Sequence, residues 1–371
     1  MLLGMKRLWI PLLAISIWTP PLLAQLELTD ADTKAKCAKY LETPLPTEAS
    51  LTAAPKTWPK CDSTKLYSGI GIEVDYTAAR QCAWTERLAI QAGIQPRFTT
   101  ASVFGGSAML TVLYANGEGV ERNIPLALRF ACEAEGAPAE IEGRLESLGA
   151  LEVTLRPQAK RFDFCDDITS GFMEGFCAAY GSEMGNQDRE NSFRALAADF
   201  TAAQRAKFDT ARGLEEAYAL AHAKDEIDLG GTARAMYQID AEDTLKDDFL
   251  EALRSFEAAK FPAGSAELYR DSDEQLNYAY RRAIDDADKH KSDYGAVQPE
   301  GVRDAERAWL KYRDAWVAFA KTRYPTVSPE AWLILLTKDR TSILDGSFCD
   351  MDAVDGPCAQ KGDTWKPSPL L

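Results

Sequence analysis

Five charged residues near the C-terminus have the chemistry for ionic recognition of a partner. They are Arg307, Lys311, Arg313, Asp314 and Arg340. A charged side chain that leaves water without a partner is costly, so each of these must pair inside the protein or stay at its surface. One interpretation is an internal network, in which Arg313 or Arg340 pairs with Asp314 or with a helix C-terminus. In the other, Arg307, Lys311 and Arg313 form a basic edge that enters an acidic cleft.

The rest of the chain offers no recognised catalytic or metal-binding pattern. There is no Gly-x-Ser-x-Gly, no His-Glu-x-x-His and no cysteine near a histidine, so a cell-wall hydrolase or other enzyme is not supported. His222 and His290 are far apart in the sequence and are interpreted as solvated helix residues. Gly230-Gly231-Thr232 is not followed by the Gly-Lys-Ser/Thr of a phosphate loop, and the acidic run 240–248 lacks EF-hand spacing. We expect a non-enzymatic protein without a cofactor or metal ion.

Three helices are expected to position the charged set. The first begins near Asp271, and one apolar stripe along it comprises Leu276, Tyr280, Ala283 and Ala287. The second carries a seam in steps of three and four residues, which comprises Val302, Ala305, Trp309, Tyr312, Trp316 and Phe319. The third opens at Ser328-Pro329 and ends at Gly346. This spacing predicts a helical hairpin with a third helix packed across it.

Residues of these helices also resemble a known family. The matching positions are Leu276-Asn277, Tyr280, the run 306–314 (Glu-Arg-Ala-Trp-Leu-Lys-Tyr-Arg-Asp), and Thr337 with Arg340. Over about residues 265–345 they resemble the LprI-like lysozyme-inhibitor domain. The resemblance implies a small secreted helical module with inhibitory activity, whose motif residues here are Leu276, Asn277, Tyr280, Trp309, Tyr312 and Thr337. Glu306 stands where the family usually has glutamine, and no cysteine flanks Trp316, so the bridge that many members carry is absent.

The net charge of the chain bears on the class of partner. At −15 the formal charge argues against nucleic acid. It would favour a cationic protein such as a lysozyme, although an acidic balance is also common in exported proteins that have no such partner. A lysozyme cleft is lined by paired carboxylates, so a basic edge inserted there would block it electrostatically.

The first residues of the chain are typical of a secretory signal. Lys6-Arg7 precede the apolar stretch 8–17, and Pro20-Pro21 precede a plausible cleavage site after Ala24. We therefore expect a periplasmic or secreted protein. No later stretch is apolar enough to span a bilayer, so no membrane span is expected in the mature chain.

Eight cysteines follow this cleavage site. An even number of cysteines in an exported chain favours disulfides over free thiols. Short spacing favours the pairs Cys165–Cys177 and Cys349–Cys358, and leaves Cys37–Cys61 and Cys82–Cys132 as less supported pairings.

A helix-turn-helix pattern occurs in the N-terminal half. Leu110, Leu113 and Tyr114 make one helix face, the glycines of 117–119 supply a turn, and an alanine-rich second helix follows with Leu126 and Phe130. This segment resembles a Sel1-like repeat of the tetratricopeptide type, and residues 67–83 echo it. The longer gap at 88–106 separates the two copies. The resemblance implies either a concave partner-binding face or a helical spacer.

Together these patterns predict an all-α, disulfide-stabilised protein with Sel1/TPR-like helix pairs followed by a helical bundle. Long helices are expected over 192–221, with a cap at Thr201, and over 232–259. The expected organisation is a signal (1–24), an irregular lead-in (25–60), Sel1-like repeats (61–155), a disulfide-closed middle region (156–262), the LprI-like module (263–347) and a cysteine-bridged tail (348–371). The leading functional hypothesis is lysozyme inhibition by protein contact. The alternative is an envelope adaptor or scaffold that binds a protein through the Sel1-like segment.

Overall fold

The computed structural model describes residues 31–94, 99–153 and 161–347, which form helices and turns with no strand among them. The predicted all-α fold is confirmed. The helices in these ranges are α1 (Ala31–Tyr40), α2 (Thr47–Leu51), α3 (Ser63–Ser68), α4 (Tyr76–Gln91), α5 (Thr100–Phe104), α6 (Ser107–Asn116), α7 (Ile124–Glu133), α8 (Pro138–Val153), α9 (Gly171–Leu196), α10 (Ala202–Asp225), α11 (Arg234–Glu257), α12 (Ala266–His290), α13 (Pro299–Arg323) and α14 (Pro329–Ser347).

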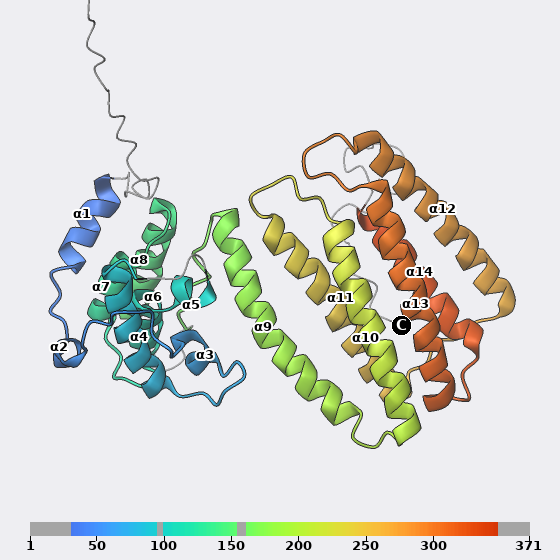
Figure 1. Cartoon of the computed structure of the whole chain (residues 1–371), viewed down its shortest axis with the longest axis horizontal. Coiled ribbons are helices and arrows are strands. Elements are labelled where there is room, and N and C mark those ends of the chain that lie inside the picture. Colours follow the sequence, from blue (N-terminus) through green and yellow to red (C-terminus); the bar gives the residue numbers. More distant parts are fainter. Residues whose placement is uncertain (1–30, 95–98, 154–160, 348–371) are drawn as a thin grey trace, which may run out of the picture.

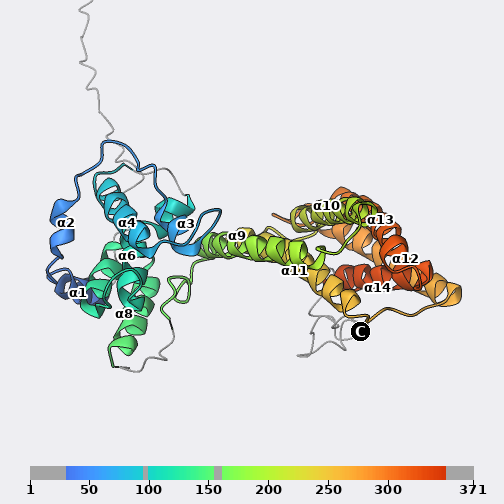
Figure 2. The ribbon, with the colours of Figure 1, turned by 90° about the horizontal axis from the view of Figure 1, so that it is seen from below.

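Two hydrophobic cores organise these helices, and α9 contributes to both (Figure 1). Helices α1 to α8 surround the N-terminal core, and α9 to α14 build the C-terminal core. Phe176 and Tyr180 in the first half of α9 pack against the N-terminal core, whereas Phe193 near its end is buried in the C-terminal core. Seen from below, α9 runs as one straight helix from one group of helices to the other (Figure 2).

The N-terminal core contains the same turn twice, once between α3 and α4 and once between α6 and α7. One constant offset in sequence relates Gly69 to Gly117, Gly71 to Gly119 and Asp75 to Asn123. All four glycines have φ between 63° and 77°, a region that side chains other than glycine rarely adopt. Asp75 and Asn123 each cap the following helix by accepting from its backbone N–H groups. Both helix pairs that the sequence predicts are present, and α5 lies in the longer gap between them.

The lead-in is more regular than its prolines suggest. Residues 31–40 form α1, which packs on α7 and α8. Its side chains Thr33 and Cys37 are buried.

Three disulfides are present in the described ranges. The predicted bridge Cys165–Cys177 is confirmed. The predicted pairs Cys37–Cys61 and Cys82–Cys132 are wrong, because the bridges are Cys37–Cys132 and Cys61–Cys82. Packing of α1 on α7 brings the first pair together across 95 residues, which spacing in the sequence does not indicate. Packing of α3 on α4 brings the second pair together, and its separation of 21 residues is shorter than that of either predicted pair. Cys349, Cys358 and the expected signal segment lie outside the described residues.

The C-terminal helices pair differently from the predicted hairpin. α12 and α13 are in contact, but α13 packs mainly along α10, and α12 mainly along α14. The cap predicted at Thr201 within 192–221 is confirmed, because α9 ends at Leu196 and Thr201 starts α10 with a capping box that it shares with Gln204. The expected helix 232–259 corresponds to α11. α12 begins at Ala266 rather than near Asp271, because Ser265 caps it.

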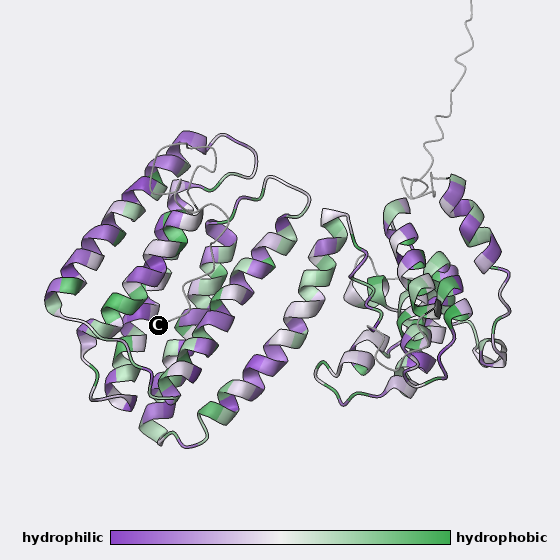
Figure 3. Cartoon of the chain, turned by 180° about the vertical axis from the view of Figure 1, so that it is seen from behind, coloured by the Kyte–Doolittle hydropathy of each residue, from purple (hydrophilic) through white to green (hydrophobic). Residues whose placement is uncertain are grey.

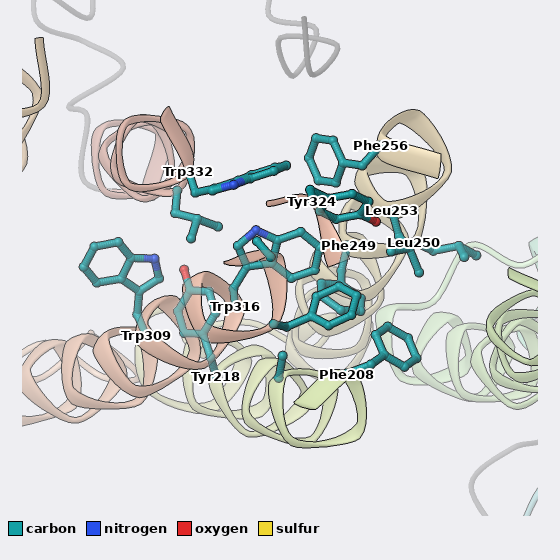
Figure 4. Packing of buried hydrophobic residues seen from close by; sticks show 14 of the residues in the cluster. Phe208, Tyr218, Phe249, Leu250, Leu253, Phe256, Trp309, Trp316, Tyr324 and Trp332 are labelled. Carbon is teal, nitrogen blue, oxygen red and sulfur yellow. The ribbon is translucent and has the colours of Figure 1, made fainter. Parts of the chain in front are cut away.

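Aromatic side chains fill the centre of the C-terminal core. In Figure 4, Trp316 of α13 lies between Phe249 and Phe256 of α11 and Trp332 of α14. Its ring centroid is 5.4 Å from that of Phe249, 5.6 Å from Phe256 and 6.1 Å from Trp332. Such tilted and edge-on contacts each contribute about 0.5–1.5 kcal/mol beyond burial.

Hydropathy follows this division between interior and surface. The long C-terminal helices are amphipathic, with hydrophilic residues over much of the visible face, and hydrophobic residues gather at the middle of the N-terminal half (Figure 3). In the part of the chain that the structure describes, no helix is both long and apolar enough to cross a membrane.

Candidate functional site

Most uncharged motif residues of the C-terminal segment belong to the core. Leu276 of α12, Trp309 of α13 and Thr337 of α14 are buried, and Tyr280 and Tyr312 pack partly buried against the same cluster. Asn277 is different, because it is exposed on α12 and its Nδ2 donates to the Asp273 carbonyl at 2.7 Å. The motif therefore mainly holds three helices together.

Arg340 lies at the centre of a buried ionic network. Its Nη1 and Nη2 donate to the two carboxylate oxygens of Glu226 at 2.8 and 2.6 Å, and its Nε donates to Glu306 at 2.9 Å. Nη1 also donates to the Tyr218 hydroxyl at 3.2 Å, and the guanidinium lies 5.4 Å from the ring centroid. The Arg340 and Glu226 side chains are both 0% exposed. Arg340 was expected among the partner-binding residues, but it is enclosed in this fold and cannot touch a partner.

The two carboxylates respond differently to this network. Burial alone would raise the pKa of Glu226, but the Arg340 guanidinium outweighs it and holds that pKa below its ordinary value. For Glu306 the order is reversed, because burial raises the pKa more than Arg340 lowers it. Glu226 is thus the principal counter-ion of Arg340.

Sequence reasoning missed Tyr218 and His222 of α10 and Glu226, which caps the C-terminus of that helix. His222 was interpreted as solvated, and that interpretation is wrong: it is buried, with Nδ1 2.9 Å from a Glu226 oxygen. Only the four-residue spacing of His222 and Glu226 on one helix face could have indicated this pair. The other histidine, His290, is exposed beside Asp293.

An exposed ridge on α13 carries the remaining charged candidates. We define the α13 ridge as Asp304, Arg307, Leu310, Lys311 and Asp314, which share one face of the helix and are all exposed. Arg307 donates to the Glu300 carboxylate at 2.9 Å and also to Asp304. Lys311 makes no ion pair within the described ranges. The ridge is a mixed-charge surface, in which Lys311 is the cation least engaged by neighbours.

Arg313 lies beside the ridge but is mostly covered. Its guanidinium stacks over Trp309, 5.3 Å from the ring centroid, and its Nε and Nη2 both donate to one Asp314 oxygen at 2.9 and 2.8 Å. The internal pairing considered for Arg313 and Asp314 is therefore present. Only 18% of the Arg313 side chain is exposed, against 55% for Arg307.

The C-terminal segment is similar to a known protein family. Residues 257–344 match the family model described as "Lysozyme inhibitor LprI", which supports the resemblance of the C-terminal segment. No curated protein and no solved structure gives a significant match to the chain. The match covers no part of the N-terminal half, so the Sel1-like resemblance is not confirmed.

The matched segment is smaller than the structural unit that contains it. It begins at the last residue of α11 and leaves out α10, yet Tyr218 of α10 and Glu226 at the C-cap of that helix are partners of Arg340. α11 supplies Phe249 and Phe256 to the same core as Trp309 and Trp332. The family-like helices therefore depend on α10 and α11 for their interior.

Proposed function

We propose that this protein is an exported, non-enzymatic lysozyme inhibitor that acts by protein–protein contact. The match of residues 257–344 to the lysozyme-inhibitor family carries the proposal. Three disulfides support a periplasmic or secreted location, because such bridges persist in oxidising compartments. The acidic chain would attract a cationic lysozyme over a long range.

The α13 ridge is the surface that we propose enters the lysozyme cleft. Arg307 and Lys311 would face the paired carboxylates of that cleft, with Leu310, 37% exposed between them, as the apolar contact. Arg307 would exchange Glu300 and Asp304 for carboxylates of the partner. That exchange is inexpensive, because exposed ion pairs contribute only about 0–1 kcal/mol. Asp304 and Asp314 would meet the cationic rim.

A double variant tests this surface. Arg307→Ala with Lys311→Ala should raise the concentration needed to inhibit lysozyme by about tenfold or more, because close interfacial charge pairs contribute strongly to binding. Arg313 is left in place, since its removal would also disturb Trp309. Lys321→Ala is the matched control, an exposed lysine further along the same helix.

The outcomes separate the alternatives. Both variants should keep the thermal unfolding curve of the wild type, because none of these side chains is in the core. If the double variant inhibits lysozyme at the same concentrations as the wild type, the α13 ridge is excluded as the surface that binds lysozyme. No inhibition by the wild type would favour an adaptor, for which the repeated turns of α3–α4 and α6–α7 are the candidate surface. Clearing of cell walls by the protein alone would instead indicate that it is a cell-wall hydrolase.

A further inference from the structure

The Cys61–Cys82 bridge differs from the other described disulfides in the exposure of its two halves. Cys61 precedes α3 and is exposed, whereas Cys82 in the middle of α4 is only 4% exposed. The other four bridged cysteines belong to the N-terminal core or pack partly buried against it. An exposed disulfide is more open to exchange with an external thiol than a covered one. An approaching thiolate would therefore meet this bridge on its Cys61 side.

A buried carboxylate lies beside the covered half of the bridge. Glu86 is 0% exposed, and its Oε1 lies 3.5 Å from the Sγ of Cys82, four residues earlier on the same helix. Glu86 Oε2 accepts from the Ser63 hydroxyl and from the Gly106 N–H at 3.0 Å, whereas Oε1 accepts from the Ser63 N–H at 3.1 Å. A carboxylate oxygen has acceptor positions for two donors. Oε1 can therefore also accept a hydrogen from Cys82 Sγ, which the sulfur carries only when the bridge is open.

Hydrogen bonds hold the two cysteines near each other without the bridge. Ser63 is buried at the start of α3, two residues after Cys61, and Glu86 accepts from both its backbone N–H and its hydroxyl. α3 also packs along α4. When the bridge opens, Cys61 thus stays beside Cys82, and the bridge can close again.

We propose that Cys61 and Cys82 form a thiol–disulfide exchange site, in which Glu86 is the proton acceptor for Cys82. Its substrates are the thiols and disulfides of other molecules. The site is independent of lysozyme inhibition.

The exchange needs no reactant other than a thiol RSH. In the opening direction the thiolate attacks Cys61 Sγ, the S–S bond breaks, and the electron pair leaves with Cys82 Sγ, which takes a proton from the Glu86 carboxyl or from water. In the closing direction Cys82 gives its proton to Glu86 and attacks Cys61 of the mixed disulfide, which releases the thiolate. A second RSH can instead attack the mixed disulfide. Two RSH are then oxidised to RSSR, and the protein disulfide is reduced to a dithiol.

The surroundings of Glu86 favour this proton transfer. Burial raises the pKa of its carboxyl group, although the hydrogen bonds that it accepts oppose the shift. The charged groups next to it are Asp62 at the start of α3, which adds to the rise, and Arg87 on α4, which is paired with Glu133 of α7. The turn between α5 and α6 contributes only a backbone N–H. Because a carboxylate of higher pKa is a stronger base, Glu86 is better suited to take a thiol proton than an exposed glutamate.

The first test compares the three described bridges in the full-length mature protein. The folded protein is treated with reduced glutathione or with dithiothreitol, free thiols are blocked with N-ethylmaleimide at successive times, and mass spectrometry of peptides follows each bridge. Cys61–Cys82 should open at least about tenfold faster than the other two, and glutathione should be found on Cys61. Circular dichroism should show that the helices persist. Equal rates for the three bridges, or glutathione on Cys82 instead of Cys61, would overturn the proposal.

Two serine variants separate the roles of the cysteines. Cys82→Ser leaves Cys61 as an exposed thiol, which should form a mixed disulfide with glutathione disulfide. Cys61→Ser leaves Cys82 covered, and it should react at least about tenfold more slowly. Both variants lose the same bridge and keep the Ser63–Glu86 hydrogen bonds, so they form a matched pair, and thermal unfolding will check that both are folded. Equal reactivity of the two thiols would contradict the proposed order of attack.

Glu86→Gln tests the proton transfer. Closure of the mixed disulfide at Cys61 should be at least about tenfold slower in this variant, because an amide takes no proton from Cys82. In the wild type the closure rate should rise with pH as Glu86 ionises, and the variant should lack this step. Glu121→Gln is the control, because that carboxylate is exposed in the turn between α6 and α7.

Two results would exclude Glu86 as the proton acceptor. One is the wild-type closure rate and pH profile in folded Glu86→Gln. The other is a wild-type pH profile with a single ionisation, that of the thiol. The second measurement needs no variant, so it tests the role of Glu86 even where the loss of a hydrogen-bond acceptor for Ser63 or Gly106 prevents the variant from folding.

Discussion

At Arg340 a guanidinium is held entirely inside the protein by Glu226, Glu306 and Tyr218. A buried charge of this kind stabilises the fold only while its partners remain, because its desolvation is costly. The family-like residue of α14 therefore joins that helix to α13 and to α10. Its role in any inhibition is to maintain the structure that presents the α13 ridge.

Arg340→Ala is expected to reduce the free energy of unfolding by about 3–5 kcal/mol, because it leaves Glu226 buried without its counter-ion. Glu306→Gln should reduce it by less than Arg340→Ala does, because glutamine still accepts from Arg340 and Arg340 keeps Glu226 as its counter-ion. Urea denaturation measures both values. Wild-type stability in Arg340→Ala would show that the network contributes nothing.

Local spacing was sufficient to place the apolar motif residues but not the ionic partners. The positions of Leu276, Trp309 and Trp316 follow from helical periodicity, which needs only neighbouring residues. The partner of Arg340 could not be predicted in this way, because Glu226 lies 114 residues earlier in the chain. Pairing across such distances depends on which helices pack together.

At the scale of elements, α13 combines an inward seam with an outward ridge. The seam packs against α10, α12 and α14, so the ridge is held on a rigid helix rather than on a loop. The helix starts at Thr201 and at Ser328-Pro329 were predictable because capping residues mark them, whereas α14 continues through Gly346 to Ser347, where the sequence predicts its end. The pairing of α13 with α10, and of α12 with α14, could not be predicted. The spacing of apolar residues shows that each helix has a buried face, but it does not show which other helix that face contacts.

The disulfide between α1 and α7 gives a test at this scale. Replacing Cys37 and Cys132 by alanine should reduce the stability of the N-terminal core by about 2–4 kcal/mol, because the bridge closes a long loop. Amide hydrogen exchange should show faster exchange in α1 and α7 and unchanged exchange in α12 to α14. Equal loss of protection in both regions would mean that the two cores unfold together.

At the scale of the molecule, two cores share one helix. The segment that matches the inhibitor family covers only part of the C-terminal core, and α9 connects that core to the repeated turns of the N-terminal half. We propose that residues from the second half of α9 to the end of α14 form a single folding unit. This replaces the expected boundary near residue 262, which would divide the core between α11 and α12.

Two fragments test this boundary. Residues 186–347 retain Phe193 and Glu226 and contain no cysteine, so they should be helical and unfold cooperatively. Residues 257–347 lack α10 and most of α11, so Arg340 loses Glu226 and the aromatic core loses one side; this fragment should not unfold cooperatively. Circular dichroism during thermal unfolding distinguishes them. A cooperative transition in the shorter fragment would contradict this proposal and support the expected domain boundary near residue 262.

The most direct test of lysozyme inhibition is the residual activity of purified lysozyme on cell walls, measured against the concentration of the mature chain at low and at moderate salt. Our account predicts a dose-dependent loss of activity that is weaker at moderate salt, because salt screens attraction between the acidic chain and a cationic enzyme. Full lysozyme activity at every concentration, even at low salt, would contradict it.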